Sequence, residues 1–358
     1  MEKFLRAFKR FYDETQQIIT VGKKGIDEFL FPTDDRDTSA NLALDKLTHV
    51  PHGVTYRDAN ESSHIRLFEP GTGQTFQIPR ISEKTPIDES LRDTVVAGIE
   101  ATASYGQHEQ LRMTQIVRNF MIAFATTRWY DALKTLRTGI FAPIGMGGQD
   151  IGLSIDFSRD ASLDIVYDFT KVGATMNEAL TEALDAYRAK NGAPTNVYVL
   201  MGRKWASLFE NDAEVLANMT SNTANVLLES AMDPSEFAGV QGLYRIAKYR
   251  VPGKVFSITI LGYEPQYKFI PYKGAAEVDY MPDDEALIFS TNDPRFRVFR
   301  GFEVKSGGSI QRVVGEIVFD SFTSDDPVGE YIRAATRQAF IPADINRTCR
   351  ATGTFEES

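Results

Sequence analysis

The longest periodic pattern in the chain is a run of apolar residues spaced three and four positions apart between His108 and Leu136. This spacing places the apolar side chains on one face of a helix, so the pattern predicts a single amphipathic helix over about 108–138. The predicted helix exceeds the usual globular length, and we expect it to support the whole molecule. Its apolar stripe consists of Leu111, Met113, Ile116, Val117, Phe120, Met121, Phe124, Trp129, Leu133 and Leu136.

The rest of the chain predicts a second helix and several strands. The second helix is expected in TMNEALTEALDAYRAKNGAP, where Thr175 and Glu178 have capping-box spacing and Gly192 provides a stop. Strand-like runs occupy 254–262, 267–272, 285–290, 295–304 and 311–322. Because helices and strands are partly segregated along the chain, the fold class is predicted to be α+β.

The first part of the chain has a basic amphipathic pattern. Phe4, Phe8, Phe11 and Ile18 have near-helical spacing. Basic residues lie between them, namely Lys3, Arg6, Lys9 and Arg10. Such a segment can lie on a membrane or on nucleic acid, but packing of the apolar stripe on its own or a neighbouring subunit is the favoured interpretation. The following stretch, FPTDDRDTSANLALDKLTHVPHGV, has no sustained periodicity and predicts an extended arm.

The clearest local motif is HIRLFEPGTGQTFQIPR at residues 64–80. Two strand-like runs flank Pro70, Gly71, Thr72 and Gly73, so the motif predicts a long hairpin that turns at these four residues. Its strands carry Arg66, Glu69 and Gln74 beside few hydrophobic residues. Because a two-stranded hairpin is marginal alone in water, we expect it to lie on this subunit or on another one.

Composition narrows the function classes. The 358 residues are 42% hydrophobic, carry a net charge of -10 and include one cysteine, Cys349. The acidic balance disfavours a sequence-specific nucleic-acid reader, and a single cysteine cannot form an internal disulfide. No apolar run approaches the length of a membrane span, and charges interrupt the N-terminus, so we expect a protein that is neither secreted nor anchored.

The stretch NVYVLMGRKWASLFEN resembles the start of a phosphate-binding enzyme, because a buried strand runs through Gly202 and Lys204 into a helix near Trp205. A phosphate loop needs more glycines, with Ser or Thr after its lysine, so a structural corner is favoured. The glycines of GMGGQDIG have Asp150 where a dinucleotide-binding motif needs its third glycine. A tight turn is therefore the better interpretation of this second stretch.

No catalytic or metal-binding pattern stands out. Pro51 lies between His49 and His52 and rules out the helical spacing of a zinc HExxH site. The acidic groups do not have calcium-loop spacing, and turn or capping roles suit them better. These groups are Asp34, Asp35 and Asp37; Asp283, Asp284 and Glu285; and Asp325 and Asp326. We therefore predict no cofactor, no metal and no enzymatic activity.

The order of these parts resembles the major capsid proteins of tailed bacteriophages with the Hong Kong 97 fold, above all the lambda-like major capsid protein E family. Four segments are similar to parts of that family. They are HIRLFEPGTGQTFQIPRISEKTPIDESL, VYVLMGRKWASLF, FIPYKGAAEVDYMPDDEALIFSTN and RFRVFRGFEV. The first resembles the extended E-loop, and the second resembles a corner of the A-domain, where Trp205 would be a core anchor.

The resemblance implies a domain organisation along the whole chain. It comprises an N-terminal arm at 1–52, an E-loop hairpin at 53–90, a P-domain at 91–158 with its spine helix at about 108–138, an A-domain at 159–300, and closing strands at 301–358 that return to the P-domain. Trp129 would be the structural anchor of the spine helix, as Trp205 would be for the A-domain.

The implied function is a viral head protein that assembles as hexamers and pentamers into an icosahedral shell around double-stranded DNA. The E-loop would contact a neighbouring subunit, and the basic arm would face the lumen. Implied partners are a separate scaffolding protein, a portal and a decoration protein, with assembly in the bacterial cytoplasm and a final location in the virion. Lys84 beside the loop is a poor crosslinking lysine, so a non-covalent shell is expected. The alternatives are an encapsulin-like compartment and an unrecognised cytoplasmic anion-binding enzyme.

Overall fold

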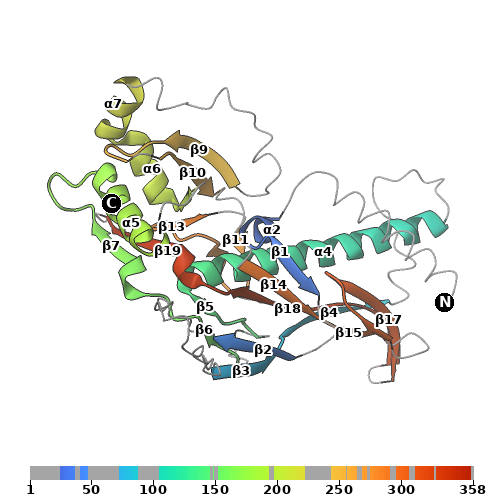
Figure 1. The fold of residues 1–358 in the computed structure, drawn as a ribbon. Coiled ribbons are helices and arrows are strands. Elements are labelled where there is room, and N and C mark those ends of the chain that lie inside the picture. Colours follow the sequence, from blue (N-terminus) through green and yellow to red (C-terminus); the bar gives the residue numbers. More distant parts are fainter. Residues whose placement is uncertain are drawn as a thin grey trace, which may run out of the picture.

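The protein is described from a computed structural model, in which two main sheets adjoin one long helix (Figure 1). The described residues are 25–36, 41–46, 72–87, 105–145, 148, 152–192, 197–221, 243–254, 256–263, 268–271, 275–290, 296–305, 311–325 and 328–355. No helix in these ranges combines the length and the apolar character needed to cross a membrane. The mixture of helices and sheets confirms the predicted α+β class.

The long helix is α4, which spans Tyr105–Thr138 and confirms the helix predicted from apolar periodicity. Part of its apolar stripe packs on the five-stranded sheet, where the ring of Phe120 lies 6.4 Å from that of Phe319. Further along, Trp129 and Leu133 enter a core shared with the six-stranded sheet. The helix therefore links the two sheets, as a spine does.

The five-stranded sheet surrounds one long central strand. Its members are β1 (Thr33–Arg36), β4 (Arg80–Ile87), β14 (Phe296–Gly301), β17 (Val318–Asp325) and β18 (Val328–Pro342). Strand β18 pairs antiparallel with β4, β14 and β17, and β1 pairs in parallel with β14. Residues 33–36 near the N-terminus therefore form a strand of this sheet.

The six-stranded sheet has the order β7-β19-β13-β8-β10-β9. Its strands are β7 (Asp164–Asp168), β8 (Val197–Met201), β9 (Leu243–Tyr249), β10 (Ile258–Tyr263), β13 (Glu285–Ser290) and β19 (Thr348–Thr354). All five residues of the central strand β8 are buried, as its continuous apolar run predicts. The associated helices are α5 (Met176–Asn191), α6 (Arg203–Asn211) and α7 (Ala213–Ser221). Thr175 caps α5 by accepting a hydrogen bond from the Glu178 backbone, which confirms the predicted start.

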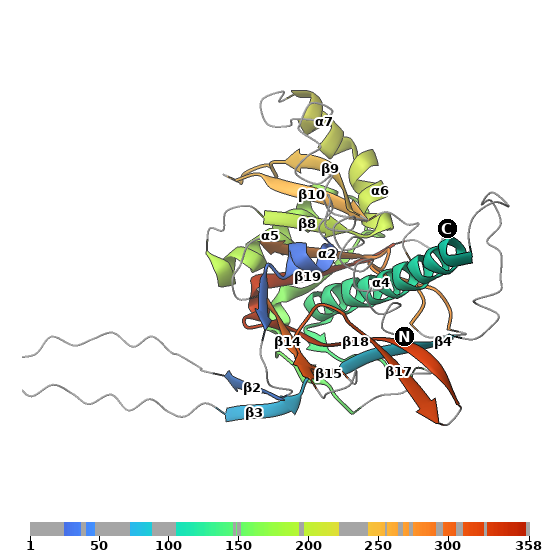
Figure 2. The ribbon, with the colours of Figure 1, turned by 90° about the vertical axis from the view of Figure 1, so that its right-hand side faces the viewer.

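Short elements complete the fold. They are the helix α2 (Ile26–Leu30), the 3-10 turns η2 (Ala161–Leu163) and η3 (Ile345–Arg347), and the two-stranded pairs β2 (Asn41–Lys46) with β3 (Thr72–Gln77), β5 (Ile140–Phe141) with β6 (Ile155–Asp156), β11 (Lys268–Phe269) with β12 (Val278–Asp279), and β15 (Glu303–Lys305) with β16 (Gln311–Val313). Figure 2 shows β2 and β3 side by side at the periphery of the molecule.

Two strands do not follow the division of the chain expected from the resemblance. Strand β14 was expected in the A-domain range 159–300, but it pairs with β1 and β18 in the five-stranded sheet. Strand β19 was expected to return to the P-domain, but it lies between β7 and β13 in the six-stranded sheet. The reason is that the chain crosses between the sheets more than once, which a division into consecutive ranges cannot represent.

Candidate functional site

The hairpin was predicted to turn at Pro70–Gly73, and the structure corrects this. Thr72, Gly73 and Gln74 lie inside β3, where their partners are residues of β2 and not of the neighbouring run. In the register, Thr72 faces Lys46 and Gly73 faces Asp45. The hairpin base is therefore formed by 41–46 and 72–77. The other predicted contact residues, Arg66, Glu69, Pro70 and Gly71, lie outside the described residues.

The second strand of the hairpin leads directly into the five-stranded sheet. Between β3 and β4, the side chain of Ile78 is only 1% exposed, and its carbonyl oxygen accepts a hydrogen bond from Arg337 Nη1 at 3.3 Å. The Gln338 amide donates to the carbonyl oxygen of Pro79 at 3.3 Å. Further along β4, Lys84 Nζ lies 4.8 Å from the ring centre of Tyr331. The hairpin therefore emerges from a fixed point on β18.

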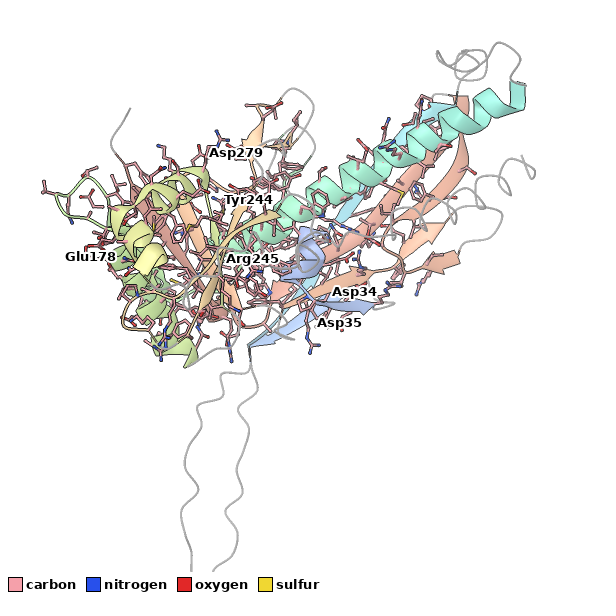
Figure 3. The ribbon with its side chains drawn as sticks, turned by 90° about the horizontal axis from the view of Figure 1, so that it is seen from above. Asp34, Asp35, Glu178, Tyr244, Arg245 and Asp279 are labelled. Carbon is pink, nitrogen blue, oxygen red and sulfur yellow. The ribbon has the colours of Figure 1, made fainter. Side chains whose placement is uncertain are left out.

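The segment before the hairpin is packed, although the sequence predicted an extended arm from residue 31 onward. Phe31 is 2% exposed, and β1 is hydrogen-bonded along β14. Asp34 Oδ1 accepts from Arg300 Nε at 2.7 Å and Asp35 Oδ2 from Arg297 Nη1 at 3.1 Å, so these carboxylates belong to a strand and not to the predicted turn (Figure 3). These two aspartates pair with arginines of β14, which the periodicity of the sequence does not identify as partners.

A buried arginine connects this segment to the spine helix. Arg128 of α4 is 5% exposed, and its Nε lies 3.2 Å from Asp27 Oδ2. Its Nη1 also pairs with Glu316, which precedes β17. Burial alone would raise the pKa of Glu316, but the charge and hydrogen bond of Arg128 hold that pKa below its usual value. The three side chains form a partly buried ionic network.

The predicted basic arm residues Lys3, Arg6, Lys9 and Arg10 lie outside the described residues. The four histidines likewise have no described side chains, and neither do Asp37 and Asp326. Within the described residues, no three His, Cys, Asp or Glu side chains gather as a set of metal ligands.

Two backbone amides of the corner at Gly202–Lys204 are already bonded to carbonyl oxygens of the protein. The Gly202 amide donates to the carbonyl oxygen of Glu285 at 2.8 Å, and the Lys204 amide donates to that of Asp283 at 2.9 Å. A Cβ on Gly202 would lie 2.0 Å from the carbonyl oxygen of Pro282, so glycine allows close packing of two backbone segments here. The ammonium of Lys204 lies over the ring of Phe355 at 5.7 Å. This geometry is that of a structural corner.

The second glycine-rich stretch forms a turn where it is described. The Gly148 amide donates to the carbonyl oxygen of Gly145 at 3.0 Å. Gly148 and Gly152 have φ values of 82° and 72°, which only glycine adopts easily. These two glycines therefore allow the backbone conformation that the turn requires.

Both tryptophans proposed as anchors are buried. Trp205 is 0% exposed, and its Nε1 donates to the carbonyl oxygen of Asp284 at 2.8 Å. Trp129 is 8% exposed in the core that α4 shares with both sheets. Each indole therefore fills a position at which two elements meet.

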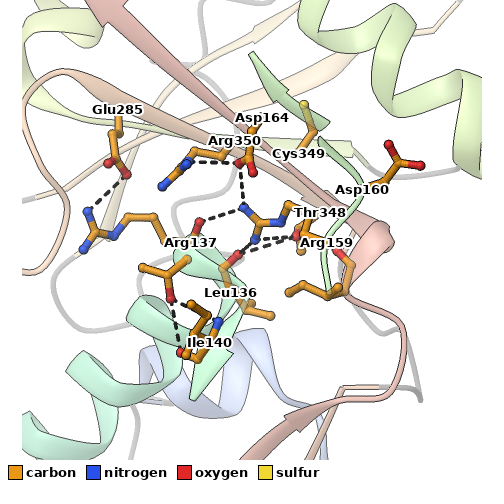
Figure 4. Close-up of polar contacts among 12 residues, drawn as sticks. Leu136, Arg137, Ile140, Arg159, Asp160, Asp164, Glu285, Thr348, Cys349 and Arg350 are labelled. Carbon is orange, nitrogen blue, oxygen red and sulfur yellow. Dashed lines mark hydrogen bonds and ion pairs between the residues drawn. The ribbon is translucent and has the colours of Figure 1, made fainter. Parts of the chain in front are cut away.

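A second buried arginine holds the end of the spine helix (Figure 4). The guanidinium of Arg159 donates to the carbonyl oxygens of Leu136 and Arg137, which belong to the last turn of α4. It also donates to Asp164 Oδ1 of β7 at 3.2 Å and to Thr348 Oγ1 of β19 at 3.1 Å. Arg159 thereby fastens the helix to the six-stranded sheet.

Two more pairs strengthen the same junction. Arg137 Nη1 lies 3.1 Å from Glu285 Oε2 of β13, and Arg350 Nε lies 3.0 Å from Asp164 Oδ1. The sequence pattern missed Arg128 and Arg159 as candidate residues. For Arg128 a signal exists, because a cation directly before Trp129 interrupts the apolar stripe of the spine helix. For Arg159 the local sequence offers only Asp164, and its other partners, at the end of α4 and in β19, are distant in sequence.

The comparisons with known proteins agree with this architecture. The family model of phage major capsid protein E matches residues 17–353. No curated protein matches the chain. A protein assigned as a capsid protein of a prophage of Escherichia coli CFT073 superimposes with a TM-score of 0.59 at 15% identity, over 92% of this chain and 93% of its own. A chain from the mature capsid of bacteriophage PhiM1 gives a TM-score of 0.42 at 11% identity, over 92% and 88%.

The family match extends over most of the sequence, and the prophage structure shares the overall fold. The chain therefore belongs to the phage major capsid protein E family, with the Hong Kong 97 fold and a capsid shell-forming function.

Proposed function

We propose that this protein assembles as hexamers and pentamers that close into an icosahedral shell around double-stranded DNA. The observation that supports the proposal most directly is the hairpin base of β2 and β3. It is a two-stranded sheet fixed at one end to β18 through Ile78 and Pro79. Such a pair is marginal in water unless another surface covers it, and a neighbouring subunit supplies that surface.

The proposed contact involves Arg66, Glu69, Pro70, Gly71, Thr72, Gly73 and Gln74 of the hairpin. Lys3, Arg6, Lys9 and Arg10 are proposed to contact the packaged DNA through phosphates, without reading sequence. Assembly is proposed to occur in the bacterial cytoplasm with a separate scaffolding protein and a portal, with a decoration protein as a further partner. The protein is proposed to have no enzymatic activity, and the corner at Gly202–Lys204, where the amides of Gly202 and Lys204 are already bonded, supports this.

Electron microscopy tests the proposal. The full chain is expressed alone and with its neighbouring reading frames, and particles are examined beside size-exclusion chromatography. Closed shells, or rings that close when a scaffold is added, are the expected result. A small oligomer that never assembles in either condition would refute the proposal. Nuclease-resistant DNA inside the shells is expected, whereas a protein cargo would favour a compartment of the encapsulin kind.

A loop variant tests the role of the hairpin. Residues 47–71 are replaced by a short Gly-Ser turn, which removes Arg66, Glu69, Pro70 and Gly71 and leaves β2 and β3 in place. This variant is expected to fold and to remain unassembled. The matched control is the double substitution Arg66→Ala and Glu69→Ala, which keeps the loop length and is expected to weaken assembly less. Normal shells from the shortened variant would remove the contact role from the loop.

A further inference from the structure

Residues 25–36, called here the arm anchor, lie where the two sheets and the spine helix meet. Phe29 is edge-on to the ring of Tyr198 in β8, with centroids 5.6 Å apart. Two residues later, Phe31 lies 5.1 Å from the ring of Phe340 in β18 and 5.9 Å from that of Phe296 in β14. The first contact belongs to the six-stranded sheet and the other two to the five-stranded sheet. The arm anchor therefore packs against both sheets at the place where they meet.

Ion pairs attach the arm anchor to the spine helix. Asp27 is 2% exposed and is paired with Arg128, which is also paired with Glu316. Because an unpaired buried charge is strongly unfavourable, this network holds α2 in one position. Space is limited at the same point, since a Cβ on Gly25 would lie 2.2 Å from Asp27 Oδ1 and 2.6 Å from Trp129 Nε1. A side chain at position 25 would therefore have to displace Asp27 or Trp129.

The other end of the arm anchor directs the hairpin. Strand β1 runs in parallel along β14, with Asp34 and Asp35 paired to Arg300 and Arg297. Strand β2 begins at Asn41, five positions after β1 ends at Arg36. The other hairpin strand, β3, is held on β18 through Ile78. Strand β2 therefore follows β1, and β3 is held on β18, while β1 and β18 lie on either side of β14 in one sheet. A shift of β1 would move one hairpin strand relative to the other.

We propose that the arm anchor is a conformational coupler that links the position of α2 on the spine helix to the direction of the β2–β3 hairpin and to the relative position of the two sheets. The contiguous contacts through Phe29, Phe31, Asp27 and β1 transmit a shift of α2, since packed elements move as units. The coupling is a property of the single subunit. It rests on the proposed function only for its consequence, which is that a shift of α2 in an assembled subunit alters the contact made by the hairpin.

Hydrogen exchange on the unassembled full chain tests the coupler. Arg128→Met removes the cation that holds Asp27 and Glu316. Amide exchange is expected to rise about tenfold in 25–36 and also in β2 and β3. The matched control is Arg159→Met, which removes another buried arginine with carboxylate and carbonyl partners but does not touch the arm anchor. In the control, α4 near Leu136 and β7 are expected to exchange faster, with no selective rise in β2 or β3.

Two results would overturn the coupler. One is faster exchange confined to 25–36 in Arg128→Met, and the other is an equal rise in β2 and β3 in both variants. If Arg128→Met does not fold, the double substitution Asp34→Asn and Asp35→Asn loosens β1 from its more exposed side. Amide exchange in 25–36, β2 and β3 is then expected to rise by a smaller factor. Because the measurement needs no assembly, shell formation by the same variants reports separately on the proposed function.

Discussion

Arg159 Nη1 donates a hydrogen bond to the carbonyl oxygen of Arg137 at 2.7 Å, at the last turn of the spine helix. Carbonyls at a helix C-terminus have no partner within the helix, and a cation there also interacts favourably with the helix dipole. Because the same guanidinium binds Asp164, the helix end is attached to the six-stranded sheet. This attachment fixes the end of the spine helix relative to the six-stranded sheet.

Replacing Arg159 should weaken the subunit as a whole. Arg159→Met removes this donor from the Arg137 carbonyl and leaves the Leu136 carbonyl with only the long contact from Thr348 Oγ1 at 3.5 Å. It also leaves Asp164 with Arg350 as its ionic partner. We expect the free energy of unfolding to fall by about 2–4 kcal/mol, measured by urea denaturation. Lys171→Met is the control, because its exposed pair with Asp168 is long at 3.9 Å and should change stability by less than about 0.5 kcal/mol. Equal losses in the two variants would contradict the capping role.

Gly202→Ala should strain the corner before α6. The added Cβ would meet the carbonyl oxygen of Pro282 at 2.0 Å, so two backbone segments must separate. Overpacking of this kind costs about 1–3 kcal/mol, which thermal or urea unfolding can measure. In Gly315→Ala, the nearest atom to the new Cβ is Val318 Cγ2 at 3.6 Å, and little change is expected. A neutral Gly202→Ala would show that the corner can relax.

The sequence predicted best those elements that depend on local periodicity. The spine helix was expected over about 108–138 and spans 105–138, because its apolar stripe is continuous. The start of α5 was equally readable, since Thr175 and Glu178 are close in sequence. The sequence did not predict the pairing between distant segments. Gly73 resembles a turn residue, but its partner in the sheet is Asp45, and no local rule identifies a partner so far along the chain.

The candidate site residues show the same difference between what a local sequence pattern predicts and what pairing with distant segments decides. Trp129 and Trp205 stand out in the sequence as large residues in apolar surroundings, and both are buried. Asp34 and Asp35 resembled a solvated turn because clustered acidic residues beside proline usually are one. Their partners Arg300 and Arg297 come from β14, far along the chain, and tertiary pairing overrode the local preference. Strand β18 is a further case, because the pattern predicted no strand over 328–342, and neighbours on both sides stabilise it there.

The single cysteine provides a direct probe of the core beside the six-stranded sheet. Cys349 is 0% exposed in β19, and its Sγ lies 3.7 Å from the carbonyl oxygen of Ala183. Burial raises its pKa to about 12, so almost no thiolate exists at pH 8. We expect a thiol reagent to react with the native subunit only as fast as it unfolds, and rapidly after denaturation. Prompt reaction of the folded protein would show that β19 opens locally, and Cys349→Ser provides the blank.

Asp131 should make the subunit less stable at neutral pH than at acidic pH. This carboxyl lies on the spine helix at 9% exposure, and burial raises its pKa to about 7, with a smaller opposite effect from Lys134. Because the pKa is about 4 in the unfolded chain, the folded state binds the proton more tightly. The stabilisation is fully present below about pH 4 and is lost as the pH rises to about 7.

Asp131→Asn removes this titration while keeping a similar shape. We expect the variant to gain about 1–3 kcal/mol relative to wild type at pH 8 and little at pH 4, measured by urea unfolding across that range. Asp168→Asn is the opposite control: Thr170 hydrogen bonds hold the Asp168 pKa below its usual value, so its contribution is present at neutral pH and disappears as the pH falls. A pH-independent effect of Asp131→Asn would mean that Asp131 is ionised in the folded subunit and that its environment is more polar than its burial indicates.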